Sequence, residues 1–144
     1  MSRDRGNRAA GWVADYLRPW WPAAEKTPNG RRGADLLGTP GVSFEIKTGR
    51  TWRNEWVNQA AGYPGVCVLV WLPPGIGPKT VGLAFAMIVD GPVEPRVHTR
   101  PVLLLEQIMP TLVAGGYAPE PARAPGPAAE AAGLADRYAE GWNR

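Results

Sequence analysis

The fold expected of this chain is decided by residues 33–48, Gly-Ala-Asp-Leu-Leu-Gly-Thr-Pro-Gly-Val-Ser-Phe-Glu-Ile-Lys-Thr. Apolar residues alternate with polar ones from Val42 to Thr48, which predicts a strand with one face on the core. Turn-forming residues precede this strand at positions 38–41, and a shorter strand is expected at Ala34 to Leu37. A turn centred near Pro40 folds the shorter strand back onto the longer one.

Two acidic residues and one lysine come together in this arrangement. Glu45 and Lys47 are two residues apart on the expected strand, so their side chains share a face. The turn places Asp35 opposite Glu45, and cross-strand partners have Cβ atoms ~4.5–5.5 Å apart. Two carboxylates that close repel each other, and a divalent cation between them relieves the repulsion. The sequence therefore predicts a site for Mg²⁺ or Mn²⁺ at Asp35 and Glu45, which the carbonyl of Ile46 can complete.

Such a site suits the hydrolysis of a phosphodiester bond. The reaction needs an activated water and neutralisation of the charge on the phosphate, and a carboxylate-held metal supplies both. Lys47 can stabilise the same charge or position the water. On many strands, however, an Asp followed by Glu-x-Lys is only a solvated polar face. A structural or partner protein without this chemistry is therefore an alternative.

Helical and strand patterns alternate along the rest of the chain. A first amphipathic helix is expected at residues 7–18, with Asn7 as its N-cap and Pro19 as its stop. The later expected elements are a helix at 52–62, a buried strand at Val66 to Leu72, a strand at Val81 to Val89 and a helix at Pro101 to Ala114. The expected inner face of the last helix consists of Val102, Leu105, Ile108, Met109 and Leu112.

This order predicts one mixed α/β domain with a central sheet flanked by helices, residues 1–118. Residues 119–144 are rich in Pro and Ala, which predicts a stiff linker and then a short C-terminal helix or a disordered tail.

Composition indicates which partners and metal sites are possible for this chain. The net charge is +3, and residues 1–55 carry ten Lys or Arg against six Asp or Glu, which suits a polyanionic partner such as DNA. A single cysteine, Cys67, and a single histidine, His98, exclude a zinc site built from Cys and His. We expect no membrane span, no secretory signal and a cytoplasmic protein, because no apolar run approaches the ~20 residues of a spanning helix.

The motif Gly33-x-Asp35, Pro40-Gly41, Glu45-x-Lys47 resembles the core motif of the PD-(D/E)xK nucleases. Within them the chain is most similar to the small Holliday-junction-resolvase-like proteins of archaea and actinobacterial phages, which open with an Arg-Gly element, here Arg5-Gly6. The resemblance implies a restriction-endonuclease-like core, Mg²⁺ dependence, cleavage of branched DNA during recombination and repair, and often a homodimer. It departs from the family at Asn7 to Gly11, where relatives usually carry a Glu on the first helix.

Further site residues are expected around this motif. Gln59, in Gln59-x-x-x-Tyr63, is similar to a glutamine that reaches the active site in RecB-type nucleases. DNA-binding residues are expected at Arg5, Arg8, Thr27, Arg31, Arg32, Arg50 and Arg53.

Three alternatives to a junction nuclease remain open. The chain can be a nuclease for flap, single-stranded or linear DNA, which Gln59-x-x-x-Tyr63 favours. It can also be a structure-specific DNA-binding protein without catalysis, which the missing acid on the first helix favours. The third alternative is the structural protein described above.

Overall fold

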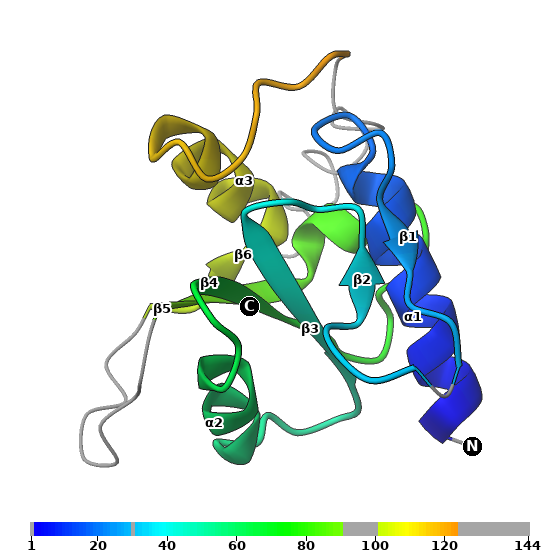
Figure 1. Cartoon of the computed structure of the whole chain (residues 1–144). Coiled ribbons are helices and arrows are strands. Elements are labelled where there is room, and N and C mark those ends of the chain that lie inside the picture. Colours follow the sequence, from blue (N-terminus) through cyan, green and yellow to red (C-terminus); the bar gives the residue numbers. More distant parts are fainter. Residues whose placement is uncertain (1, 30, 91–100, 124–144) are drawn as a thin grey trace, which may run out of the picture.

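The computed structural model describes residues 2–29, 31–90 and 101–123 of the 144-residue chain (Figure 1). This part is an α/β structure with three α-helices, a four-stranded mixed sheet and a separate pair of short strands. The helices are α1 (Ser2–Leu17), α2 (Glu55–Ala61) and α3 (Leu105–Ala114), with a 3-10 helix, η1, at Val81–Leu83. The strands are β1 (Glu25–Lys26), β2 (Leu36–Leu37), β3 (Val42–Thr48), β4 (Val66–Leu72), β5 (Phe85–Asp90) and β6 (Leu103–Leu104).

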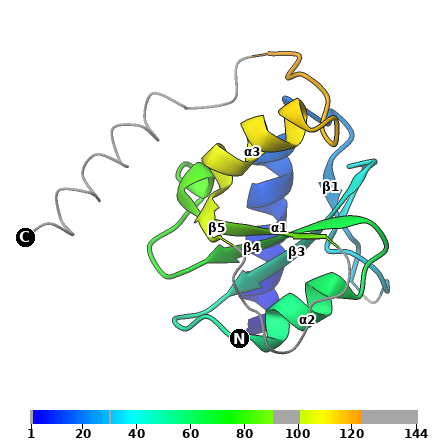
Figure 2. The same ribbon diagram turned by 90° about the vertical axis from the view of Figure 1, so that its left-hand side faces the viewer.

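The central sheet has the strand order β3-β4-β5-β6. Strands β3 and β4 run parallel, whereas β5 is antiparallel to both β4 and β6. The parallel pair aligns Glu45 with Leu69 and Lys47 with Trp71. Figure 2 shows α3 and α2 on opposite sides of this sheet. Among the described residues β3 is an edge strand, so one row of its backbone groups faces away from the sheet.

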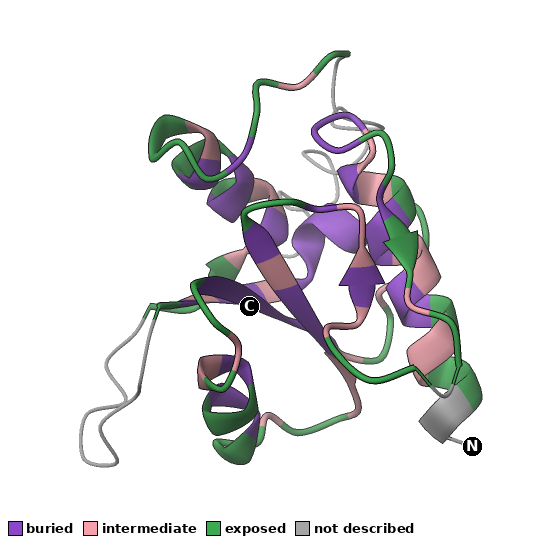
Figure 3. Ribbon diagram, viewed as in Figure 1, coloured by how far each residue is buried: buried purple, intermediate pink, exposed green. Residues whose placement is uncertain are grey.

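Alternation along β3 and β4 divides the core into two clusters. The larger cluster lies on the side of α1 and α3, and Phe44, Val68 and Leu105 are all fully buried in it. The smaller cluster joins Leu69 of β4 to α2 through Trp56 and its neighbours. Because β4 is buried on both faces, its sequence is a continuous apolar run, and Figure 3 shows it buried along its length.

Strands β3 and β4 confirm the predicted segments residue for residue, but the predicted starts of α1 and β5 are wrong. Helix α1 begins at Ser2, so Asn7 lies inside the helix and is not its N-cap. The predicted strand at Val81 to Val89 begins only at Phe85. Its first residues form η1 instead, because the N–H groups of Leu83 and Ala84 donate to carbonyls three residues back, both at 2.9 Å.

The two later helices are shorter at their N-terminal ends than expected. Helix α2 begins at Glu55 rather than at residue 52, and α3 begins at Leu105 rather than at residue 101. Val102 therefore precedes α3 and is 44% exposed, so its expected place on the inner face is wrong. The other four predicted inner-face residues are buried, namely Leu105, Ile108, Met109 and Leu112.

The predicted strand at Ala34 to Leu37 is confirmed only for β2. It pairs antiparallel with β1, which aligns Glu25 with Leu37, and not with β3. The chain turns at Gly38 so closely against residues 23 and 24 that β2 is held beside β1.

The linker and tail are described only in part. The N–H of Ala122 donates to the carbonyl of Pro19 at 2.8 Å, so the chain after α3 returns to the end of α1. The expected C-terminal helix or disordered tail falls on residues 124–144, outside the described residues. None of the described helices has the length and apolar character that crossing a membrane requires.

The close turn at Gly38 generates a test of the fold. Gly38 has a φ of 78°, and a Cβ there would clash with the backbone carbonyl of Ala23. We expect Gly38→Ala to lower the free energy of unfolding by about 3 kcal/mol or more, measured by urea denaturation, because backbone clash adds to left-handed strain.

Gly65→Ala is the matched control. Gly65 has a φ of 77°, but a Cβ there meets nothing within 4 Å. Strain alone should then lower the free energy of unfolding by about 1 kcal/mol. Equal losses for the two variants would contradict the close approach at Gly38.

Candidate functional site

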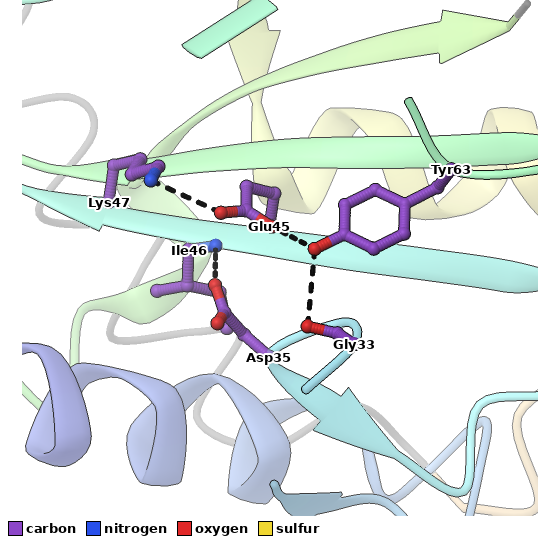
Figure 4. Close-up of polar contacts among 6 residues, drawn as sticks. All are labelled: Gly33, Asp35, Glu45, Ile46, Lys47 and Tyr63. Atoms are coloured by element: carbon purple, nitrogen blue, oxygen red, sulfur yellow. Dashed lines mark hydrogen bonds and ion pairs between the residues drawn. The ribbon is translucent and has the colours of Figure 1, made fainter. Parts of the chain in front are cut away.

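Asp35 is attached to the free edge of β3 by two hydrogen bonds, and Figure 4 shows the one between its carboxylate and Ile46. Its own N–H donates to the carbonyl of Phe44 at 3.1 Å, and its Oδ2 accepts from the N–H of Ile46 at 2.7 Å. A strand residue directs its N–H and its carbonyl to the same side. The Ile46 carbonyl is therefore directed to the same edge as the Asp35 carboxylate.

Glu45 lies at the centre of the site and is only 8% exposed. Its Oε1 lies 3.1 Å from Nζ of Lys47, which confirms that the two side chains share a face of β3. Its Oε2 accepts a hydrogen bond of 2.7 Å from the hydroxyl of Tyr63. That hydroxyl also lies 3.2 Å from the carbonyl oxygen of Gly33, so Tyr63 joins the segment after α2 to the segment before Asp35.

Electrostatics at the site oppose a second negative charge. The pKa of Asp35 is raised from its usual 3.8 to about 6, first by burial and then by the charge of Glu45, while the Ile46 N–H and Lys47 act against the rise. Burial, followed by the hydrogen bond and charge of Glu45, also raises the pKa of Tyr63. Burial and then Glu45 raise the pKa of Cys67 to about 12, so this thiol stays protonated at neutral pH. Burial is the first cause of all three shifts, and the negative charge of Glu45 adds to each of them.

The donor set fits a hard divalent cation. Asp35 and Glu45 supply two carboxylates, and the carbonyl of Ile46 supplies a third oxygen. Each carboxylate oxygen has a second lone pair, so the bonds to Lys47 and Tyr63 do not prevent coordination. No cluster of three or more His, Cys, Asp or Glu residues suited to a metal occurs among the described residues. Mg²⁺ is commonly held by one or two carboxylates and otherwise by water and phosphate oxygens, which this set permits.

Among the described residues, the predicted DNA-binding arginines form no ion pair with Asp35 or Glu45. Arg31 and Arg32 are exposed in the segment just before Asp35, and Arg50 is exposed after β3. The exposed Arg53 lies 3.5 Å from Oε1 of Glu55, and exposed ion pairs of this kind contribute little. The last two arginines, Arg5 and Arg8, are exposed on the first turns of α1.

The hydroxyl of Thr27, which was predicted to bind DNA, forms a hydrogen bond within the protein. Its hydroxyl donates to the carbonyl of Ala34 at 2.6 Å, and its N–H donates to the carbonyl of Asp35 at 2.9 Å. Both bonds fix the chain on either side of Asp35, so Thr27 positions the acid that the sequence predicts as a metal ligand.

The residue of the Gln59-x-x-x-Tyr63 element that bonds to Glu45 is Tyr63. Gln59, which the resemblance places at the active site, is exposed on α2, whereas the side chain that reaches Glu45 is Tyr63. The helix ends at Ala61, so Tyr63 lies beyond it and turns toward β3. Tyr63 follows Gln59 by four residues, so the sequence did place it near the end of the helix. The helical period alone does not show where the helix ends, and so it could not show that Tyr63 turns toward Glu45.

Comparison with protein-family models, with curated proteins and with solved structures found no match to this chain. The site is therefore interpreted from its own residues.

The raised pKa of Asp35 predicts how stability changes with pH. The folded protein holds this proton between about pH 4 and pH 6, where the unfolded chain has lost it, so ionised Asp35 lowers stability above that window. We expect Asp35→Asn, in EDTA at pH 7.5, to raise the free energy of unfolding by on the order of 1–2 kcal/mol, a value reduced because the carboxylate is only partly buried.

Urea denaturation at pH 4, 5, 6 and 7.5 measures this gain, which should vanish near pH 4. Glu25→Gln, at an exposed acid on β1, serves as the control and should change stability little at any of these pH values. A loss of stability in Asp35→Asn at pH 7.5 would show that the carboxylate is not under repulsion.

The Tyr63 hydroxyl offers a second test. We expect Tyr63→Phe to lower the free energy of unfolding by about 0.5–1.5 kcal/mol, because it removes a hydrogen bond from a buried carboxylate. Thermal denaturation should place Tyr117→Phe, at a ring that is 46% exposed, within error of the wild type. Equal stability of the two variants would contradict the bond to Glu45.

Proposed function

We propose that this protein is a metal-dependent endonuclease with a restriction-endonuclease-like core, which hydrolyses phosphodiester bonds of DNA using Mg²⁺, or Mn²⁺ in its place. The observation that carries the proposal is the meeting of Asp35, Glu45, Lys47 and the Ile46 backbone at the free edge of one strand. An acid pair beside a lysine on a rigid strand supplies the groups that phosphate hydrolysis requires.

Each group has a separate role in this proposal. The two carboxylates and the Ile46 carbonyl would hold the cation, which when bound would supply an activated water and neutralise charge on the phosphate. Lys47 places its ammonium where negative charge develops on the phosphate oxygens. Tyr63 keeps Glu45 oriented by its hydrogen bond of 2.7 Å. Gln59, exposed on α2, can assist only by reaching the substrate from the solvent side.

Exposed cations support DNA as the substrate. Exposed arginines occur before β2, after β3 and on α1, and such side chains can neutralise the phosphates of a DNA backbone. We propose branched DNA, such as a four-way junction, as the preferred form. A homodimer is part of this proposal, because resolution of a two-fold junction needs two paired cuts.

Two alternative functions predict different results for DNA binding and cleavage. A nuclease for flap, single-stranded or linear DNA uses the same groups on another substrate. A structure-specific DNA-binding protein without catalysis is favoured by one observation: no third acidic side chain joins Asp35 and Glu45 among the described residues. It would bind DNA in EDTA and cleave it with neither cation.

Cleavage assays on labelled DNA test the proposal. With Mg²⁺ or Mn²⁺ we expect the wild type to cut a four-way junction, and Asp35→Asn, Glu45→Gln and Lys47→Ala each to lose about 10²-fold or more in rate. All three variants should still bind the junction in EDTA. Flap, single-stranded and linear substrates in the same panel identify the preferred form.

Glu25→Gln and Lys79→Ala are the matched controls, since they remove the same kinds of charge at exposed positions outside the site. Both should cut at the rate of the wild type. Wild-type binding without cutting in either metal would overturn the enzyme and leave the DNA-binding alternative.

A further inference from the structure

A cavity opens at the C-terminal ends of β3 and β4, on the side of the sheet that α1 covers. It encloses about 290 Å³ and lies between α1 and the segment that follows β4. Because β3 and β4 are parallel, their carboxyl ends meet at one edge of the sheet, which is where ligands of open α/β sheets commonly bind. Its walls include Arg5, Arg8 and Trp12 of α1, Thr48 at the end of β3, and Leu72 and Ile76.

The cavity combines positive charge with an aromatic wall. Arg5, Arg8 and Trp12 are spaced three and four residues apart, so they form one stripe along α1. Both arginines are exposed, and no Asp or Glu occurs among the described residues that line the cavity. Trp12 is half-buried against the core, which fixes its ring while leaving part of it accessible. A phosphate and a flat apolar ring together match these walls.

The position of the cavity relates it to the cut strand. Thr48 and Gly49, which line it, directly follow Lys47. Two residues of extended strand span about 7 Å, a distance on the order of one or two nucleotide steps. Lys47 and Thr48 point to opposite faces of β3, so a DNA strand with its phosphate at Lys47 reaches the cavity by passing around the C-terminal end of β3.

We propose that this cavity receives one unpaired nucleotide of the DNA substrate, with its base against Trp12 and its phosphate between Arg5 and Arg8. The inference rests on the proposed function and names the feature of DNA that the protein recognises. A volume near 290 Å³ lies at the small end of ligand pockets, so it admits a single nucleotide and not a duplex. A base reaches it only where pairing is already absent or is lost on binding.

Binding assays in EDTA test the inference without cleavage. Three labelled DNAs of equal length are compared: a fully paired duplex, a duplex with one bulged nucleotide, and the same bulge with an abasic sugar. We expect the wild type to bind the base-bearing bulge roughly tenfold more tightly than the other two, because stacking requires the base. The abasic bulge separates recognition of the base from recognition of a bend.

Variants of the wall then locate the effect. Trp12→Leu and Arg8→Ala should reduce the preference for the base-bearing bulge to less than about twofold, while Trp12→Phe, which keeps a ring, should retain most of it. Because the preference is a ratio of affinities for two DNAs, a loss of phosphate affinity that is equal for both DNAs does not change it. Lys79→Ala removes an exposed charge that does not line the cavity and should keep the ratio of the wild type. Melting temperatures establish that the Trp12 variants are folded.

The outcomes separate this inference from the nuclease proposal. Equal binding of the three DNAs by the wild type, or an unchanged ratio in both Arg8→Ala and Trp12→Leu, overturns the inference even if junction cleavage is observed. If the binding preferences for the bulge are as expected but no DNA is cleaved in Mg²⁺ or Mn²⁺, the nucleotide site stands and only the nuclease proposal is overturned. Binding of free deoxynucleoside monophosphate with no preference among the DNAs would assign the cavity to a free ligand and also overturn the inference.

Discussion

The hydrogen bond from the Ile46 N–H to the Asp35 carboxylate is the contact on which the arrangement of the site depends. An edge strand presents backbone groups that would otherwise pair with another chain. Asp35 occupies two of these groups on β3, one with its own N–H and one with its side chain. The same contacts therefore protect the edge and bring a second carboxylate to Glu45, which lies on the adjoining face of the strand.

This placement has an energetic consequence for the two acids. Burial and the neighbouring Glu45 both disfavour ionised Asp35, and the Ile46 N–H and Lys47 only partly offset them. Lys47 and Tyr63 meanwhile each occupy one oxygen of Glu45. The two acids are thus held together by groups around them and not by attraction between them. A divalent cation would remove the repulsion between the two carboxylates, so the proposed cofactor would stabilise the arrangement that the fold imposes.

The sequence predicted most reliably the parts in which side-chain period and burial agree. The alternation in Val42 to Thr48 and the apolar run at Val66 to Leu72 gave correct strands, and the two-residue spacing placed Glu45 beside Lys47. The pairing of β2 with β1 was missed because Glu25 and Lys26 are both exposed and carry no apolar signal.

The position of Tyr63 was missed for a different reason: it depends on where α2 ends, and helix ends are fixed by local backbone geometry that periodicity does not encode. The cavity beside Thr48 was likewise hidden, because its walls come from three segments far apart in the chain.

Several hydrogen bonds hold the segment before Asp35 in place. Thr27 bonds to the backbone of Ala34 and Asp35, Arg31 donates its N–H to the carbonyl of Pro28, and Tyr63 meets the carbonyl of Gly33. The backbone that carries Arg31 and Arg32 is therefore ordered before any partner arrives, while the two side chains remain exposed to solvent. Capture of an anion by these two side chains would cost side-chain entropy of about 0.5–1.5 kcal/mol for each arginine.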